Sequence, residues 1–381
     1  MLRLEKGKVG MDRDELWAWL RLLLTPHVGP VTARRLLANL GSPQAIFSAS
    51  PAALALLVSA REVAALTEVP PDLHPQGVAT QKWLAEGSGD RHLLTLADPR
   101  YPARLLEAAN PPLVLFAQGQ LAALQGPAVA VVGSRHPTPQ GADNACAFAR
   151  ALAQAGVAVV SGLARGVDAA AHEGAMDAPE GRTVAVLGTG IDVIYPKAHA
   201  ALAQRITQHG LLLSEFLLGT GPLPAHFPKR NRIVAALAQG TLVVEAAVQS
   251  GSLITARLAL DMGREVLAIP GSIHSPQSRG CHALIRQGAK LVETAQDVLE
   301  ELHVSAPEGG AEPTMLTSPD EGDASLDPLL AAMGYDPVSQ EALSARTGWG
   351  PAALGARLLE LELLGQVARL PGQLFQRVGA A

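Results

Sequence analysis

Apolar and polar positions divide the chain into stretches with different periodicities. From Asp14 onward, leucine and tryptophan recur at intervals of three and four residues, which predicts a set of short helices. From residue 128, short apolar runs alternate with segments of helical periodicity. Residues 327–333, 339–347 and 351–364 predict three further helices, and two short strands follow them. Three helices and a hairpin in this order are typical of a winged helix.

The central apolar runs are nearly continuous, which is the pattern of strands buried on both faces. Such strands, when helices separate them, indicate a parallel sheet covered by helices on both sides. We therefore predict a doubly wound α/β domain of the extended Rossmann-like class. The predicted strands are 128–132, 157–161, 183–187, 211–216, 241–246, 265–269 and 290–292.

Two stretches without periodicity separate the ordered parts. Residues 69–77 are rich in proline, and residues 305–327 are acidic and rich in Pro, Gly, Ser and Thr. The predicted organisation is a disordered lead (1–13), an all-helical domain (14–85), a Rossmann-like domain (90–302), an acidic flexible linker (303–325) and a winged helix (326–381).

Composition narrows the class of protein. The 381 residues carry a formal net charge of -5, and 48% of them are hydrophobic, which is enough for a sizeable core. Cys146 and Cys281 give neither a disulfide framework nor the spacing of metal ligands. The charged start has no apolar signal segment, and no apolar run approaches the ~20 residues of a membrane span. We expect a cytoplasmic protein without a cofactor or a metal.

Positive charge gathers at one place in this acidic chain. Lys229, Arg230 and Arg232 lie close together, whereas Glu245 is the only acidic residue between positions 216 and 260. A local excess of lysine and arginine is suited to binding phosphate groups.

The loops after the predicted strands carry residue types that bind phosphate. Ligands of doubly wound sheets bind beyond the carboxyl ends of the strands. Glycine allows close backbone approach, helix N-termini favour anions, and arginine matches phosphate oxygens. We therefore predict a phosphate-binding crevice, formed by Gly133, Ser134 and Arg135, by Gly162, Arg165 and Gly166, by residues 188–192, by Phe227 with the basic cluster, and by Ser250, Gly251, Ser252 and Thr255.

Nucleotide-binding fingerprints are absent from these loops. The first strand is followed by GSRHPTPQG rather than G-x-G-x-x-G, and no G-x-x-x-x-G-K-[ST] occurs, so neither a dinucleotide cofactor nor phosphoryl transfer is expected. Asp168, His172 and Glu245 are the best catalytic candidates. Structural roles are favoured for all three: Asp168 as a helix cap, His172 as its partly buried partner, and Glu245 as a counter-ion of Arg230 or Arg232.

For two other elements, the sequence does not decide whether they contact DNA. Residues 26–43 resemble a helix-hairpin-helix motif, but His27 occupies the position of its first glycine and only Gly29 remains, which favours packing over phosphate contact. The predicted recognition helix of the winged helix, 350–365, carries Arg357 against two glutamates, whereas a helix that reads DNA is usually basic. A protein contact or a regulatory role is at least as well supported there.

The motifs taken together resemble one family. The segments GSRHPTPQG, SGLARGVDAAAH, GTGIDVIYP, FPKRNRIVAALAQGTLVVEAA and IPGSIHSPQSRGCHALIRQGAKLV occur in the order typical of the DNA-processing protein A family, also called DprA or Smf. The resemblance is strong over residues 14–302 and looser in the winged helix.

This resemblance implies a function that spacing alone does not. The family binds and protects single-stranded DNA and helps to load the RecA recombinase on it, notably in natural transformation, and it has no established catalysis. Its DNA-pocket motifs fall on Gly133, Ser134, Arg135, Gly162, Arg165, Gly166, Phe227, Arg230, Asn231 and Arg232, next to the Ser250–Thr255 turn. The family also forms homodimers through the late Rossmann region, where the candidates are Leu260, His282, Ile285 and Leu291.

Two alternatives remain open on the residues alone. One is an enzyme that acts on a nucleotide, for example a phosphoribohydrolase that uses Glu245. The other is a module that senses a nucleotide and passes its state to the winged helix.

Overall fold

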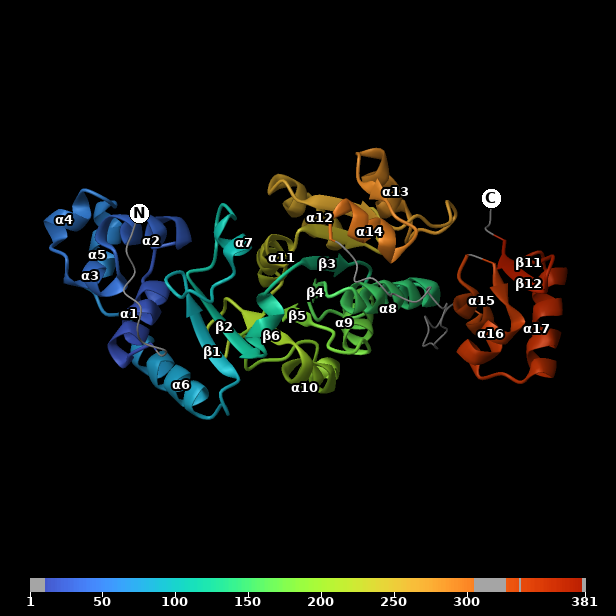
Figure 1. The fold of residues 1–381 in the computed structure, drawn as a ribbon, viewed down its shortest axis with the longest axis horizontal. Coiled ribbons are helices and arrows are strands. Elements are labelled where there is room, and N and C mark those ends of the chain that lie inside the picture. Colours follow the sequence, from blue (N-terminus) through green and yellow to red (C-terminus); the bar gives the residue numbers. More distant parts are fainter. Residues whose placement is uncertain (1–10, 305–326, 336, 379–381) are drawn as a thin grey trace. The chain divides into compact units, whose positions relative to one another are not determined.

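The computed structural model describes residues 11–304, 327–335 and 337–378 (Figure 1). These residues form two compact units, of which the first contains residues 11–118, 189–193 and 213–221, and the second contains the rest. The predicted lead up to residue 10 and the predicted linker between 305 and 326 lie outside the described residues.

The first unit begins with helices whose ends follow local capping rules. Asp12, Ser42, Ser50 and Ser59 each accept a backbone N–H of the first turn of a helix, which satisfies a donor that the helix leaves unbonded. The Asp12 cap places the start of the first helix at Arg13, inside the predicted lead. The helices are α1 (Arg13–Leu24), α2 (Pro30–Leu40), α3 (Pro43–Ser48), α4 (Pro51–Ala55), α5 (Ala60–Thr67) and α6 (Leu73–Ala85).

A two-stranded antiparallel pair follows the helices of the first unit. Strand β1 (Arg91–Thr95) pairs with β2 (Val114–Gly119), and the short helix α7 (Ala103–Leu106) lies between them in the chain. The pairing brings Leu94 opposite Leu115, and both side chains are fully buried.

All strands from β1 to β9 belong to one sheet, in the order β1-β2-β6-β5-β4-β3-β7-β8-β9. Strands β3, β4, β5, β7, β8 and β9 pair in parallel. Their order reverses between β3 and β7, which is where doubly wound sheets bind ligands. The strands are β3 (Ala128–Val132), β4 (Ala158–Ser161), β5 (Thr183–Val186), β6 (Leu211–Ser214), β7 (Gly240–Val243), β8 (Glu265–Ala268) and β9 (Lys290–Leu291).

Helices cover this sheet through apolar side chains. Residues of α8, α9 and α14 share one buried cluster with β3, β4, β7 and β8, while α11 and α12 contact each other as well as β3 and β7, respectively. This arrangement confirms the predicted doubly wound α/β fold. The helices are α8 (Pro139–Gln154), α9 (Val167–Met176), α10 (Ala200–His209), α11 (His226–Leu237), α12 (Ser252–Asp261), α13 (Arg279–Arg286) and α14 (Ala295–Glu301).

The C-terminal elements form the predicted winged helix. A three-stranded sheet in the order β10-β12-β11 packs with three helices around Leu329, Leu343, Leu354 and Phe375. The elements are α15 (Pro328–Met333), β10 (Val338–Ser339), α16 (Gln340–Thr347), α17 (Pro351–Leu363), β11 (Val367–Leu370) and β12 (Leu374–Arg377). Across the described residues, no helix is both long and apolar enough to cross a membrane.

Candidate functional site

The candidate site is a cavity of about 700 Å³ at the carboxyl ends of β3, β4 and β7, within the second unit. It therefore lies at the reversal of strand order, as expected for this fold. The structure brings most of the predicted crevice together there. The predicted residues that line the cavity are Gly133, Ser134, Arg135, Gly162, Phe227, Arg230, Asn231, Ser250, Gly251, Ser252 and Thr255.

Helix α11 presents only one of its faces to the cavity. Phe227, Arg230, Asn231 and Val234 line it, and their spacing of three and four residues places them on the same side of the helix. Lys229 and Arg232 lie on other faces, because each residue of a helix is turned by about 100° from the last. Neither of these two cations is part of the cavity wall.

Arg230 lies at the bottom of the cavity. Its side chain is only 4% exposed, and Nη1 donates a hydrogen bond to the Val186 carbonyl oxygen at 2.6 Å. A Cβ atom at Gly162 would lie 1.8 Å from Nη1, so glycine at that position is what lets the guanidinium lie against the loop. Burial lowers the pKa of Arg230, the charge of Asp168 raises it, and the charge of Arg135 lowers it.

Asp168 holds the loop between β4 and α9. Its Oδ2 accepts the backbone N–H groups of Gly162 at 3.1 Å and Ala164 at 3.3 Å. The cap of α9 is Gly166, so Asp168 braces the preceding loop instead of capping the helix as predicted. Burial raises the pKa of the Asp168 carboxyl, although the charge of Arg230 opposes that effect.

His172 holds the same loop from inside the core. It is fully buried rather than partly buried, and it accepts the Leu163 N–H at Nε2 (3.3 Å) while Nδ1 lies 2.7 Å from the Thr183 hydroxyl. Because the Thr183 hydroxyl donates to the Val159 carbonyl oxygen, Nδ1 is the protonated nitrogen. Burial lowers the pKa of His172 to about 3, so the ring is neutral at physiological pH.

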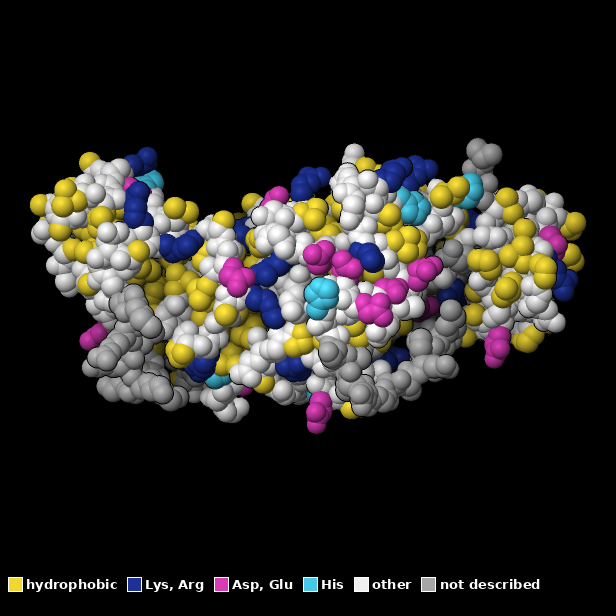
Figure 2. Space-filling model, turned by 45° about the horizontal axis from the view of Figure 1, so that its top comes forward, with side chains coloured by type: hydrophobic (Ala, Val, Ile, Leu, Met, Phe, Trp, Pro, Cys, Tyr) yellow, Lys and Arg dark blue, Asp and Glu magenta, His cyan; other side chains and the backbone are white. Residues whose placement is uncertain are grey.

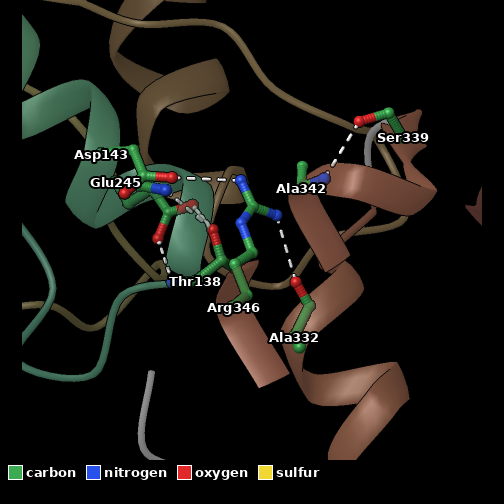
Figure 3. Close-up of polar contacts among 8 residues, drawn as sticks. Thr138, Asp143, Glu245, Ala332, Ser339, Ala342 and Arg346 are labelled. Carbon is green, nitrogen blue, oxygen red and sulfur yellow. Dashed lines mark hydrogen bonds and ion pairs between the residues drawn. The ribbon is translucent and has the colours of Figure 1, made fainter. Parts of the chain in front are cut away.

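Glu245 follows β7 in the chain, and its side chain contacts the residue that caps α8. Its carboxylate accepts the Thr138 backbone N–H at 2.8 Å and the Thr138 hydroxyl at 2.6 Å, and Thr138 caps α8 (Figure 3). A Cβ atom at Gly141 would lie 2.3 Å from Cδ of this carboxyl group. The acidic residue whose charge acts on Arg230 is Asp168, which corrects the predicted pairing of Glu245 with that arginine.

Aromatic rings and a guanidinium form one wall of the cavity. The Phe227 ring lies 5.7 Å from the Arg135 guanidinium carbon and 5.6 Å from the Tyr195 ring, centroid to centroid. Tyr195 is 47% exposed and lines the cavity, yet it was not among the predicted site residues. The available signal was an aromatic residue three positions after the 188–192 loop, in a chain with only 3% aromatic residues.

The electrostatic balance of the cavity is positive. Arg135 and Arg230 both line it, and Asp168 is the only acidic residue among its lining residues. The N-terminus of α12 also opens into it at Gly251 and Ser252, which adds partial positive charge. The site is therefore suited to an anion with an apolar, planar group attached.

Several predicted residues lie outside the cavity. Arg165 is exposed but does not line it, and Gly166 supports the Gly133–Arg135 loop, because a Cβ atom there would meet the Ser134 carbonyl oxygen at 2.4 Å. Gly166 also has a φ of 75°, which favours glycine. Within the described residues, no group of three or more His, Cys, Asp or Glu side chains is placed to hold a metal ion.

The candidate dimer residues lie on α12, α13 and β9. Leu260 and Leu291 are exposed, Ile285 is half-buried, and the His282 ring nitrogen Nε2 lies 3.0 Å from the Gly271 carbonyl oxygen. His282 therefore does not pair with Cys281, whose thiol has its pKa raised by burial to about 12 and is unreactive.

The hairpin of the first unit departs from the glycine pattern of its motif. His27 adopts a positive φ of 65°, at the position where the motif has glycine, and Gly29 is the N-cap of α2. The backbone of the hairpin is thus kept while a side chain replaces the hydrogen atom of glycine.

Comparison with known proteins agrees with this geometry. Protein Smf of Escherichia coli (strain K12) is 42% identical over 299 residues, which cover 76% of this chain and 78% of that protein. DNA processing protein DprA of Streptococcus pneumoniae is 49% identical over 207 residues, 54% of this chain and 73% of that protein.

Two solved structures share the fold. DNA processing protein A from Streptococcus pneumoniae has a TM-score of 0.63 and 37% identity, and the match covers 76% of this chain and 98% of that one. The protein from Helicobacter pylori, whose structure was described for its single-stranded DNA binding mode, has a TM-score of 0.51 and 31% identity over 56% of this chain and 96% of that one.

Family models match all three parts of the chain. The DprA-like N-terminal HHH domain matches residues 13–70, and the DprA winged helix domain matches residues 312–373. The model described as DNA recombination-mediator protein A matches residues 92–303. The chain belongs to the DNA recombination-mediator protein A family.

Proposed function

We propose that this protein binds single-stranded DNA in the cavity at the switch point, protects it, and helps to load the RecA recombinase on it during recombination and natural transformation. The observation that carries the proposal is the cavity itself, where two arginines, one carboxylate and two aromatic rings converge. Arginine and exposed aromatic rings together are the residue types that hold single strands without reading sequence. The Helicobacter pylori relative is described as binding single-stranded DNA, which supports single-stranded DNA as the ligand of this cavity.

In this proposal, each side chain has a separate role. Arg135 is exposed and contacts a backbone phosphate, and the hydroxyl groups and N–H groups at the start of α12 contact a second one. Phe227 stacks on a base. Arg230 positions the Gly162 loop and supplies charge from below. The cations outside the cavity, Lys229, Arg232 and Arg165, contact phosphates of the flanking strand.

We propose that the site binds DNA without turnover. The carboxyl group of Glu245 is engaged by Thr138 at the start of α8, and Asp168 is engaged by two loop N–H groups. His172 has its pKa lowered to about 3 and is enclosed in the core, so it is not a general base for a ligand in the cavity.

A homodimer completes the proposal. Leu260 on α12 and Leu291 on β9 are exposed, and β9 is the edge strand at one end of the sheet order. The free side of an edge strand and exposed apolar side chains favour association. Two linked pockets on one strand raise the effective concentration of the second contact. The rest of the strand stays accessible to RecA.

Calorimetry with two ligand classes, combined with a turnover assay, tests the proposed function. A single-stranded oligonucleotide should bind tightly, while a mononucleotide should bind weakly and should not be consumed. Release of a free base from a nucleoside monophosphate would instead indicate an enzyme. Tight mononucleotide binding without oligonucleotide binding would indicate a nucleotide sensor.

A further inference from the structure

Helix α17 of the winged helix is apolar on two opposite sides. Leu354, Leu358 and Leu361 are buried in the core of the winged helix. Leu359 and Leu363 point the other way and are 57% and 81% exposed. Since this helix occupies the position of a recognition helix, its outer face is the surface that a ligand of the domain would meet.

The exposed side has the spacing of a helix-packing stripe. Ala352, Ala356, Leu359 and Leu363 are all exposed, and they follow each other at intervals of four, three and four residues. This is the a/d spacing by which helices pack side by side. Leu364 extends the apolar surface and is 63% exposed. Figure 2 shows apolar side chains gathered over the winged helix, at the right of the view.

Acidic residues flank the stripe on both sides. At about 100° per residue, Glu360 and Glu362 lie on opposite sides of the line through Leu359 and Leu363. Arg357, the single basic residue of α17, is ion-paired with Asp327 and Glu360. The polar rim of the stripe is therefore negative.

The arginine of α16 is also engaged. Arg346 is buried, and it donates hydrogen bonds to the Ala332 carbonyl oxygen at 3.1 Å and to Asp143 of α8 at 3.0 Å (Figure 3). Over residues 327–381 the sequence has five acidic and four basic residues. A domain that binds DNA phosphates needs the opposite balance.

We propose that the outer face of α17 binds an amphipathic helix of a partner protein, and that the partner helix has apolar residues at heptad spacing flanked by lysine or arginine. The spacing of the stripe selects a helix as the occupant. The negative rim selects basic flanks. The stripe from Ala352 to Leu363 is about 17 Å long, so the partner helix has at least about three turns.

A second copy of this chain does not meet the same requirement. If two α17 helices packed on each other, the Glu360 and Glu362 rims of both copies would lie together and repel. Charge complementarity therefore favours a different polypeptide. Double-stranded DNA is disfavoured for the same reason, because its phosphates would face the glutamates.

The test uses the full-length protein and two synthetic helical peptides of three heptads. Both peptides have leucine at positions a and d, and they carry either lysine or glutamate at positions e and g. Fluorescence anisotropy of the labelled peptides should show binding of the lysine peptide at least about tenfold tighter than binding of the glutamate peptide. Equal binding of the two peptides, or binding of neither, would overturn the proposal.

Variants then locate the binding surface. Leu359→Ser with Leu363→Ser should weaken the lysine peptide by about tenfold or more, since two leucines leave the interface. The matched control, Leu56→Ser with Val69→Ser, changes two exposed apolar residues in the other unit and should have no effect. Glu360→Lys with Glu362→Lys should reverse the preference between the peptides. Unchanged affinity in the leucine variant would contradict the proposal, as would a change in sedimentation or in duplex binding with no change in peptide binding.

Discussion

At the scale of single residues, the two arginines that line the cavity are not equivalent. Arg230 is buried over Asp168 and bonded to the Val186 carbonyl oxygen, whereas Arg135 is exposed at the cavity wall. Removing Arg230 would leave the Asp168 carboxylate buried without its cation, which is destabilising in itself. Arg135 is therefore the cleaner position at which to test phosphate binding.

Tyr195 provides a test of the aromatic wall. Because its exposed ring lies next to that of Phe227, we expect it to stack on a second base. Tyr195→Ala should weaken binding of a single-stranded oligonucleotide by roughly 5- to 150-fold, as stacking is worth ~1–3 kcal/mol per base. Tyr195→Phe keeps the aromatic ring and should retain most of the affinity. Both affinities can be measured by fluorescence anisotropy of a labelled single-stranded oligonucleotide. Equal affinity of wild type and Tyr195→Ala would show that this ring does not contact the strand.

At the scale of elements, the apolar pattern predicted the strands of the sheet from β3 onward, but not the order in which they pair. Strands β3 to β8 lie in mainly apolar runs, and β3 was predicted over the same residues that form it, 128–132. The faces of α11 were harder to predict, because FPKRNR reads as one cluster until the helix separates Arg230 from Lys229 and Arg232. Tyr195 was missed because its loop follows β5, and proximity to Phe227 depends on the path of that loop in space.

His172, which holds the β4–α9 loop, should make the stability of the protein depend on pH. The pKa of His172 falls from 6.5 to about 3 on folding, so the folded state binds fewer protons than the unfolded state between these values. The stabilisation is thus present above pH 6.5 and is lost as the pH falls toward 3, by up to about 1.4 kcal/mol per pH unit. Urea unfolding at a series of pH values should show this loss in the wild type.

Two variants test whether His172 is the source of this pH dependence. His172→Gln should flatten the pH dependence by up to about one proton, because glutamine does not titrate. His209→Gln, at an exposed position of α10, is the matched control for replacing a histidine outside this loop. Parallel curves for wild type and His172→Gln would refute the assignment.

At the scale of the whole molecule, we propose that the central α/β domain and the winged helix have separate roles. In this proposal the central domain binds the DNA strand in its cavity and forms the dimer at its β9 edge, while the winged helix binds a partner protein through α17. The sequence predicted the order and class of these domains through their periodicities, and the charge of the predicted recognition helix made a protein contact or a regulatory role at least as well supported as DNA binding. The division between buried and exposed leucines on α17 required the fold, because both sets have the same spacing.

The proposed dimer is tested by its mass in solution. Leu260→Glu with Leu291→Glu should shift the protein from dimer to monomer in sedimentation velocity, since it places charges in an apolar contact. Binding of long single strands should weaken as avidity is lost, while short oligonucleotides should bind each pocket as before. Leu56→Glu, which changes an exposed leucine in the other unit, is the matched control and should leave the protein dimeric. A variant that remains dimeric would move the interface elsewhere.

We propose that the cavity at the switch point binds a single strand through both its phosphates and its bases. The most direct test is the salt dependence of oligonucleotide binding, measured by anisotropy for wild type, Arg135→Ala and Arg135→Ala with Phe227→Ala. We predict that the wild type binds single-stranded DNA more tightly than double-stranded DNA. Arg135→Ala should make the negative slope of log K against log[salt] shallower by about 0.7, because one phosphate contact is lost. The double variant should also lose the preference for single-stranded DNA. Unchanged slope and unchanged preference in the double variant would place DNA binding outside this cavity and contradict the account.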